Sequence, residues 1–206
     1  GPVAKASDLE GARTVVNHTT GGITGDFSAV TGVGAGDADY IVNDAKKSAD
    51  GLDYSIGSAL AWNAAAPLSS GKFTLTNASD AFDVDVVLAD QAANGSAWDG
   101  QSLDKLGQGT LTLSAANTYT GATRLLAGTL KTGVENAFAD SSSLLVGVGT
   151  TFDLNNFNQQ VHNIAGGGNI ALGTATLTMD MEDNLGLGAV ISGTGGIVKE
   201  GTGTLT

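Results

Sequence analysis

The chain has 206 residues, no cysteine and a formal net charge of −12 at pH 7. Without cysteine it can form no disulfide, no thiolate metal site and no cysteine nucleophile. Nine Lys and Arg residues stand against 21 Asp and Glu residues, which argues against nucleic acid and anionic membranes as partners, because phosphates are bound by basic side chains. No apolar run approaches the roughly 18 residues that a membrane helix needs, so we expect no direct insertion of this chain into a membrane.

The composition favours strands and turns over helices. Glycine accounts for 31 residues, and only four of the 21 acidic residues are Glu. The remaining acidic residues are Asp, which prefers turns and helix caps to helix interiors. With 41% hydrophobic and 15% charged residues the chain is apolar enough to fold. We therefore expect an all-β protein.

Short stretches of alternating apolar and polar residues recur between Gly, Asn and Asp residues, which is the pattern of half-buried strands. One face of each stretch is apolar, and the other carries Thr, Asp or Lys. The best helical candidate, residues 78–93, is interrupted by strand-like alternation. In chain order the predicted strands are residues 72–76, 83–86, 110–113, 151–154, 169–172 and 174–181.

One ten-residue segment occurs twice. Residues 103–112 and 197–206 share six of ten positions, among them the pairs Lys105/Lys199 and Gly107/Gly201. The repeated unit is therefore about 94 residues long, which exceeds one turn of a solenoid, so we expect it to contain several turns.

Two all-β architectures compete, an antiparallel sandwich and a parallel β-helix. A sandwich needs tight hairpins, but no Asn-Gly or Asp-Gly pair joins two alternating strands at two-residue spacing. The Asp50-Gly51 pair follows two lysines and a serine instead. Glycine-rich corners suit a chain that bends sharply at each turn, as at residues 147–149, 166–168 and 193–196. A parallel β-helix is therefore favoured.

Several segments of the chain resemble a known repeat. Residues 107–114 (GQGTLTLS), 117–121 (NTYTG) and 127–130 (AGTL) resemble the passenger-associated transport repeat of autotransporters, the type V secreted proteins of Gram-negative bacteria. The similarity continues to the second copy of the repeat, and residues 22–100 resemble the segment that often precedes it.

The resemblance implies a right-handed parallel β-helix (solenoid) that is displayed on the bacterial cell surface and anchored in the outer membrane through a C-terminal barrel outside this sequence. It divides the chain into residues 3–94, which form either N-terminal β-helix turns or an irregular cap, and residues 95–206, the β-helix with the repeat. Gly1 and Pro2 are typical of the remnant of a removed expression tag. At about 20 residues and about 4.8 Å per turn, we expect about ten turns.

Few residues are candidates for catalysis. A β-helical polysaccharide lyase or hydrolase would combine clustered Asp residues and Ca²⁺ with an Arg base, which could here be Arg13 or Arg124. The alternative is that such Asp side chains form the solvated face of a strand. The nearest cluster consists of Asp80, Asp83, Asp85 and Asp90.

The remaining candidates are two histidines and two tryptophans. His162 is interpreted as a surface or corner residue, and neither it nor His18 is assigned a catalytic or metal role. Trp62 and Trp98 are expected to cap the core beneath irregular turns, with stacking on a ligand as the alternative. Residues 34–39 and 166–169 do not complete a calcium-binding repeat. We assign no catalytic, metal-binding or cofactor-binding residue, and the binding residues stay open.

We expect a non-enzymatic fragment of an autotransporter adhesin stalk. It would mediate attachment to a host-surface or extracellular-matrix ligand, or self-association between cells in aggregates and biofilms, through flat ladders of Thr, Asn and Asp. A second hypothesis is an autochaperone-like scaffold segment that folds early and supports passenger folding and export. A β-helical polysaccharide lyase or hydrolase is the third.

Overall fold

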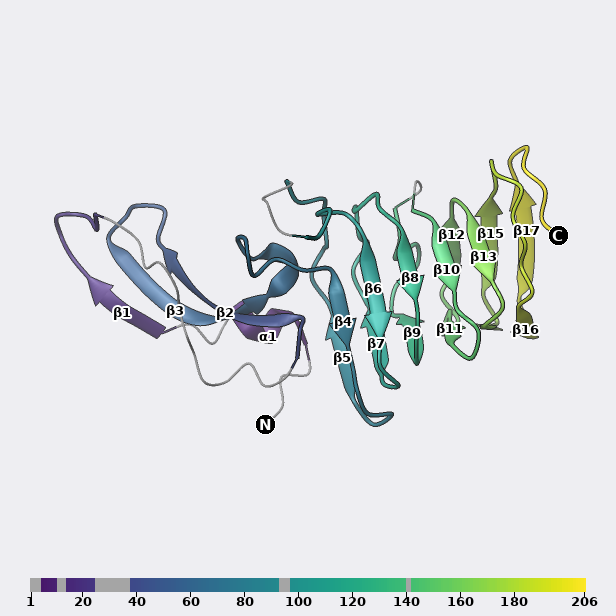
Figure 1. Cartoon of the computed structure of the whole chain (residues 1–206), viewed down its shortest axis with the longest axis horizontal. Helices are drawn as coiled ribbons and strands as arrows, with labels where there is room; N and C mark the ends of the chain where they lie inside the picture. Colours follow the sequence, from purple (N-terminus) through teal and green to yellow (C-terminus); the bar gives the residue numbers. More distant parts are fainter. Residues whose placement is uncertain (1–4, 11–13, 25–37, 93–96, 140–141) are drawn as a thin grey trace.

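The computed structural model describes residues 5–10, 14–24, 38–92, 97–139 and 142–206 (Figure 1). Gly1, Pro2 and Arg13 lie outside the described residues, as does most of residues 34–39. The molecule is elongated, with a small antiparallel sheet at one end and a stack of coils that runs to the C-terminus at the other. None of the helices in this part of the chain has the length and apolar character to cross a bilayer.

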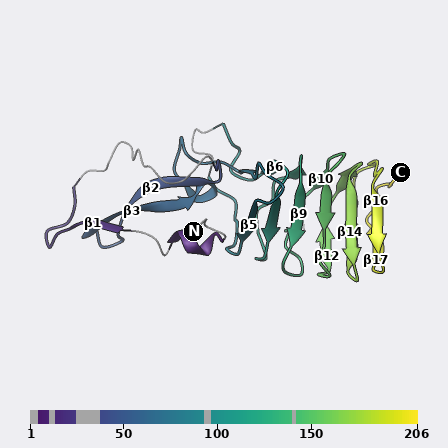
Figure 2. The ribbon, with the colours of Figure 1, turned by 90° about the horizontal axis from the view of Figure 1, so that it is seen from below.

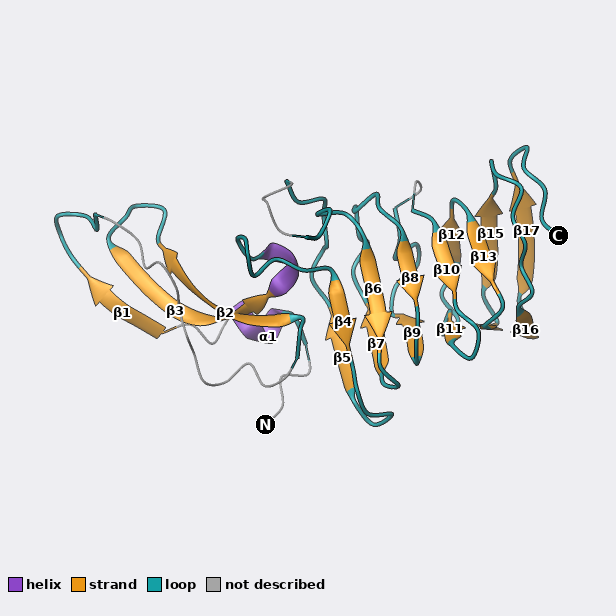
Figure 3. Cartoon of the chain, viewed as in Figure 1, coloured by secondary structure: helices purple, strands orange, loops and turns teal. Residues whose placement is uncertain are grey.

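The coils form three parallel sheets that run along the stack. Every strand pair within these sheets is parallel, which confirms the predicted parallel β-helix. Figure 3 shows how strands and corner loops alternate around the coils.

The five-stranded sheet has the order β13-β10-β8-β6-β4. Its strands are β4 (Lys72–Thr74), β6 (Leu103–Leu106), β8 (Thr123–Leu125), β10 (Leu144–Val146) and β13 (Ile164–Gly166). The six-stranded sheet has the order β16-β14-β11-β9-β7-β5, and successive strands lie side by side along the stack (Figure 2). Its strands are β5 (Ala81–Val84), β7 (Thr110–Leu113), β9 (Thr129–Thr132), β11 (Thr151–Asp153), β14 (Asn169–Gly173) and β16 (Val190–Gly193). The third sheet has the order β12-β15-β17, with β12 (Gln159–Val161), β15 (Thr176–Asp180) and β17 (Gly196–Glu200).

The length of one coil follows from the strand register. Leu103 pairs with Thr123, Thr123 with Leu144, and Leu144 with Ile164. The numbers of these partners rise by about 20 residues at each step, which is the period that the family resemblance implies. The six-stranded sheet holds one strand from each of six successive coils, which correspond to five turns rather than the expected ten.

The core is a set of columns of inward-facing side chains. Because strand side chains alternate between the two faces, every second residue of a coil points inward and meets its register partner one coil away. One column is formed entirely by residues with at most 1% exposure: Phe82, Leu111, Leu130, Phe152 and Ile170. Burying each such side chain contributes about 1.5–3 kcal/mol, and this hydrophobic gain holds the stack together.

The expected turn count fails because the N-terminal residues form another structure. After the short helix α1 (Ser7–Glu10), the strands β1 (Thr14–His18), β2 (Ile41–Lys47) and β3 (Asp53–Leu60) make an antiparallel sheet of order β1-β3-β2, followed by a 3-10 turn, η1 (Ala61–Asn63). The link between β2 and β3, residues 48–52, is a loop that contains the Asp50-Gly51 pair. Asp50 Oδ1 accepts hydrogen bonds from Ser48 Oγ at 2.5 Å and Leu52 N at 3.0 Å, and Gly51 has φ +72°. The sequence interpretation gave this pair no hairpin role, and that was wrong.

The predicted division of the chain at residue 94 stays a prediction. Strands β4 and β5 lie before it and pair in parallel with β6 and β7, which lie after it.

Two glycines with positive φ allow a test of how closely the coils approach each other. Gly107 has φ +71°, and a Cβ there would lie 2.1 Å from the Leu75 carbonyl oxygen of the preceding coil. Gly149 has φ +79° and open space around it. We expect Gly149→Ala to cost about 1–2 kcal/mol from backbone strain alone. Gly107→Ala should cost about 3 kcal/mol or more, because backbone must also move.

Urea unfolding of both variants and the parent protein, followed by circular dichroism, measures the difference. Equal losses of stability would contradict the close approach of the coils at Gly107.

Candidate functional site

The paired carboxylates predicted on one strand are engaged by neighbouring protein groups. Asp85 accepts hydrogen bonds from the backbone N–H of Ser7 at 2.8 Å and from its hydroxyl at 2.6 Å. Burial alone would raise the pKa of Asp85, but the hydrogen bonds from Ser7 hold it below its usual value. Asp83 accepts a hydrogen bond from the Ser114 hydroxyl, and Lys5 Nζ lies 4.0 Å away. These two residues therefore anchor the N-terminal segment and a neighbouring coil.

The other two members of the cluster stabilise turns. Asp80 accepts a hydrogen bond from Asn77 N at 2.8 Å, and Asp90 accepts two from Thr120, both at 2.8 Å. Arg124 lies on β8 of the five-stranded sheet, whereas Asp83 lies on β5 of the six-stranded sheet. The structure thus does not bring Arg124 to the Asp cluster. Across the described residues, no group of three or more acidic or His side chains could hold a metal ion.

The two histidines lie far apart in the chain. His18 Nδ1 is 2.5 Å from Asp53 Oδ1 on the antiparallel sheet, with both side chains exposed. His162 follows β12 directly, and its backbone N–H donates to Ser142 O at 3.0 Å. This is the corner position expected for His162.

Trp62 packs in the core, as expected. It is 1% exposed, and its Nε1 donates to Ala89 O at 2.8 Å. Trp98 packs against it with ring centroids 4.7 Å apart and an interplanar angle of 66°. Trp98 itself is half-buried and lines a surface pocket.

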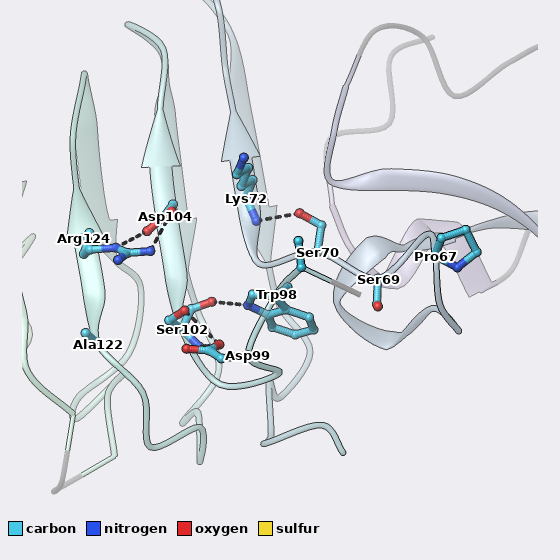
Figure 4. A pocket seen from close by; sticks show the side chains of 11 residues that line it. Pro67, Ser69, Ser70, Lys72, Trp98, Asp99, Ser102, Asp104, Ala122 and Arg124 are labelled. Atoms are coloured by element: carbon cyan, nitrogen blue, oxygen red, sulfur yellow. Dashed lines mark hydrogen bonds and ion pairs between the residues drawn. The ribbon is translucent and has the colours of Figure 1, made fainter. Parts of the chain in front are cut away.

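This pocket has a volume of about 440 Å³ and lies on the outer face of β4, β6 and β8 (Figure 4). Arg124 donates to Asp104 through Nε at 2.5 Å and Nη2 at 2.9 Å, and this hydrogen-bonded pair raises the pKa of Arg124. Asp99 Oδ1 accepts from Gln101 N and Ser102 N, both at 2.8 Å. Partial burial would raise the pKa of Asp99, but these hydrogen bonds lower it. Arg124, Asp104 and Asp99 are thus held in fixed positions in the pocket.

A second candidate surface is the outer face of the six-stranded sheet. The outward-facing partners Thr110, Thr129 and Thr151 form one row, and Thr112, Lys131 and Asp153 form the next. Neighbouring strands lie about 4.8 Å apart, so these side chains form regular ladders on a flat surface. This arrangement can make many weak hydrogen bonds to another flat surface.

Lys105 is a buried lysine that the sequence interpretation did not single out. Its side chain is 0% exposed and lies in an inward column between Phe73 and Leu125. Nζ donates to three carbonyls, those of Leu106 and Gly107 at 2.8 Å and that of Ala127 in the next coil at 3.0 Å. The ammonium group therefore ties two coils together.

The second copy of the repeat builds the same corner. Lys199 Nζ donates to the carbonyls of the two residues that follow it, Glu200 and Gly201, both at 3.1 Å. Gly107 and Gly201 both have positive φ, +71° and +74°. The repeated Lys-x-Gly pattern therefore encodes a turn whose carbonyls are bound by the lysine, and the identity of Lys105 and Lys199 was the signal for it.

The parallel coils place the chain among the β-solenoid proteins. Comparison with known proteins shows what the chain is similar to. The model of the passenger-associated transport repeat matches residues 103–131, which cover β6 to β9. The chain is also 40% identical over 110 residues to the adhesin BmaC autotransporter of Brucella suis biovar 1 (strain 1330). This match covers 50% of the chain and 3% of that protein. These findings confirm the resemblance of the chain to an adhesin-like autotransporter passenger domain.

The buried position of Lys105 predicts a pH dependence of stability. Burial lowers the pKa of Lys105 to about 8, from an ordinary value of 10.5. Between these values the unfolded chain binds more protons than the folded chain at this residue, so this contribution to stability rises with pH. Below pH 8 both states are protonated and the contribution is constant. We expect Lys105→Met to lose stability relative to the parent protein as pH rises from about 8 to about 10.5.

Urea unfolding across this range measures the difference, and Lys131→Met, on the outer face of β9, controls for loss of a charge. A difference between Lys105→Met and the parent protein that stays constant with pH would contradict the prediction.

Proposed function

We propose that this passenger segment acts in adhesion at the bacterial cell surface, without catalysis. It attaches cells to a host-surface or extracellular-matrix ligand, or to one another through copies of itself. The observation that carries the proposal is the flat, regularly spaced face of the six-stranded sheet. The similarity to a protein named as an adhesin supports it.

The charges on this face favour pairing between two copies. Lys131 and Asp153 are register partners on adjacent strands of the same outer face. In a twofold arrangement, Lys131 of each molecule can face Asp153 of the other, and the Thr ladders then meet between them. Two molecules that each carry a charge of −12 repel, so we expect association to strengthen as salt screens this repulsion.

Charge reversal tests this arrangement. We expect Lys131→Glu to abolish self-association and the double change Lys131→Glu with Asp153→Lys to restore it, because the double change re-forms both contacts with opposite polarity. Lys46→Glu, on β2, changes the net charge equally and should retain more association than Lys131→Glu. Sedimentation velocity at about 0.01 M and about 0.15 M salt, where the Debye length falls from about 30 to about 8 Å, measures the effect. Monomers under all conditions would exclude self-association of this chain.

A second candidate function is an autochaperone-like scaffold. It is favoured by Lys105, which binds carbonyls of two successive coils within the segment matched by the repeat model. Since a solenoid folds by adding coils to existing coils, a stable pair of coils can template its neighbours.

Surface display separates the two functions. With the chain in a longer passenger on cells, we expect deletion of residues 101–130 to reduce display severalfold if the segment is a scaffold. Lys105→Met should have the same effect to a smaller degree, whereas Lys131→Glu should leave display unchanged. Antibody labelling of intact cells measures display, and a cell-attachment assay measures adhesion. Normal display of the deletion variant with lost attachment would favour adhesion over the scaffold.

A further inference from the structure

The first coil is longer than those that follow it. The length of chain between register partners shows this. The first coil runs from Phe73 on β4 to its partner Lys105 on β6, whereas the next coil runs only from Lys105 to its partner Leu125. The shorter second coil also reaches its register partner, so the additional residues of the first coil are not needed to bring the next strand into register. Part of this longer segment, residues 97–102, returns to the outer face of the sheet and lines the pocket of about 440 Å³ (Figure 4). Loops that leave a rigid scaffold are common positions for binding sites.

The indole of Trp98 is fixed in the pocket by contacts on several sides. Its Nε1 donates to Ser102 O at 2.7 Å, and its ring meets Trp62 edge-on. A Cβ on Gly71 would lie 2.4 Å from Trp98 Nε1, so only glycine allows the backbone to approach the ring this closely. The ring therefore forms a preorganised apolar surface and loses little freedom when a ligand stacks on it.

The charged groups beside Trp98 balance one another. Lys72, Asp104 and Arg124 are register partners on β4, β6 and β8, and Asp99 lies at the same pocket. Two cations and two anions make the pocket neutral, although the chain as a whole carries a charge of −12. Among the described residues Lys72 has no ion-pair partner, so its ammonium can donate to a ligand.

We propose that this pocket binds a neutral saccharide. The C–H groups on one face of a pyranose ring are apolar and stack on an indole, while its hydroxyl groups donate to carboxylates and accept from ammonium groups. Trp98 supplies the indole, Asp104 and Asp99 the acceptors, and Lys72 a donor. The volume lies within the range of about 300–1,000 Å³ that is typical of small-molecule sites. The negative charge of the chain disfavours acidic saccharides.

This site deepens the attachment part of the proposed function by naming a ligand class, but saccharide binding in solution is measured without reference to cells. It also lies on a different sheet from the ladders proposed for self-association. The charge-reversal variants of that face should therefore bind saccharide normally, so failure of one proposal is distinguishable from failure of the other.

The test is a titration of the whole chain with the methyl glycosides of glucose, galactose, mannose and N-acetylglucosamine, and with glucuronic acid. Proton–nitrogen correlation spectra resolve the two indole N–H groups, which substitution of either tryptophan assigns. We expect at least one neutral glycoside to shift the Trp98 indole signal saturably at concentrations up to about 10 mM, with little change at Trp62. Trp98→Ala should weaken binding about tenfold and Trp98→Phe less, because phenylalanine retains an aromatic ring.

Lys72→Gln keeps the proposal testable if Trp98→Ala does not fold, since Lys72 is exposed and its removal leaves the core intact. We expect it to weaken binding about threefold to tenfold, with Lys46→Gln, on β2, as the control that retains full affinity. The absence of any saturable shift at Trp98, binding that Lys72→Gln leaves unchanged, or tighter binding of glucuronic acid than of every neutral glycoside would each overturn the proposal.

Discussion

The stacking of coils in a constant register is the constraint on which the rest of the structure depends. Each strand hydrogen-bonds to the strands one coil before and one coil after it, so an inward side chain must fit a column rather than a single partner. Polar residues enter these columns only where the backbone satisfies them. Thr132 Oγ1 donates to Leu154 O at 2.8 Å, and Lys105 donates to three carbonyls. Within the described chain, no buried side-chain nitrogen or oxygen lacks a hydrogen-bond partner.

This constraint leaves the outer faces and the corner loops as the places where function can vary. An outward residue can change without disturbing its column, and a loop can lengthen as long as the next strand returns to register. The first coil contains such a lengthened loop, because the chain takes a longer path from Phe73 to its partner Lys105 than from Lys105 to Leu125. The flat ladders lie on a surface that the core does not restrict, and the pocket also lies on an outer face, although the Trp98 ring packs against the buried Trp62. The site residues therefore differ in kind from the core residues. Most lie on the outer face of the same strands, whereas Trp98 and Asp99 lie in the loop before β6.

Sequence patterns predicted the coils better than the N-terminal part of the chain. Alternation at residues 110–113 and 151–154 identified strands because each coil strand buries one face. The antiparallel sheet was not predicted, because its hairpin loop spans residues 48–52. The Asp50-Gly51 pair therefore does not have the two-residue spacing of a tight turn. The buried position of Lys105 was not predicted for another reason. Charged residues normally face outward, and only the three carbonyl acceptors, which come from the corner and the next coil, explain its inward direction. The pocket depends on a contact between Trp98 and Gly71, which are distant in the sequence, and no local pattern encodes such a contact.

The two copies of the repeat show which level of structure the sequence motif specifies. Their separation of about 94 residues is not a whole number of coils of about 20 residues. Lys105 accordingly lies on β6 in the five-stranded sheet, whereas Lys199 lies on β17 in the sheet of β12 and β15. Both nevertheless bind the carbonyls of the two residues that follow them. The motif therefore specifies a corner and not a position around the coil. Because a lysine-bound corner stands on two of the three sheets, repeats can recur along such a stack while different surfaces are presented outward from one repeat to the next.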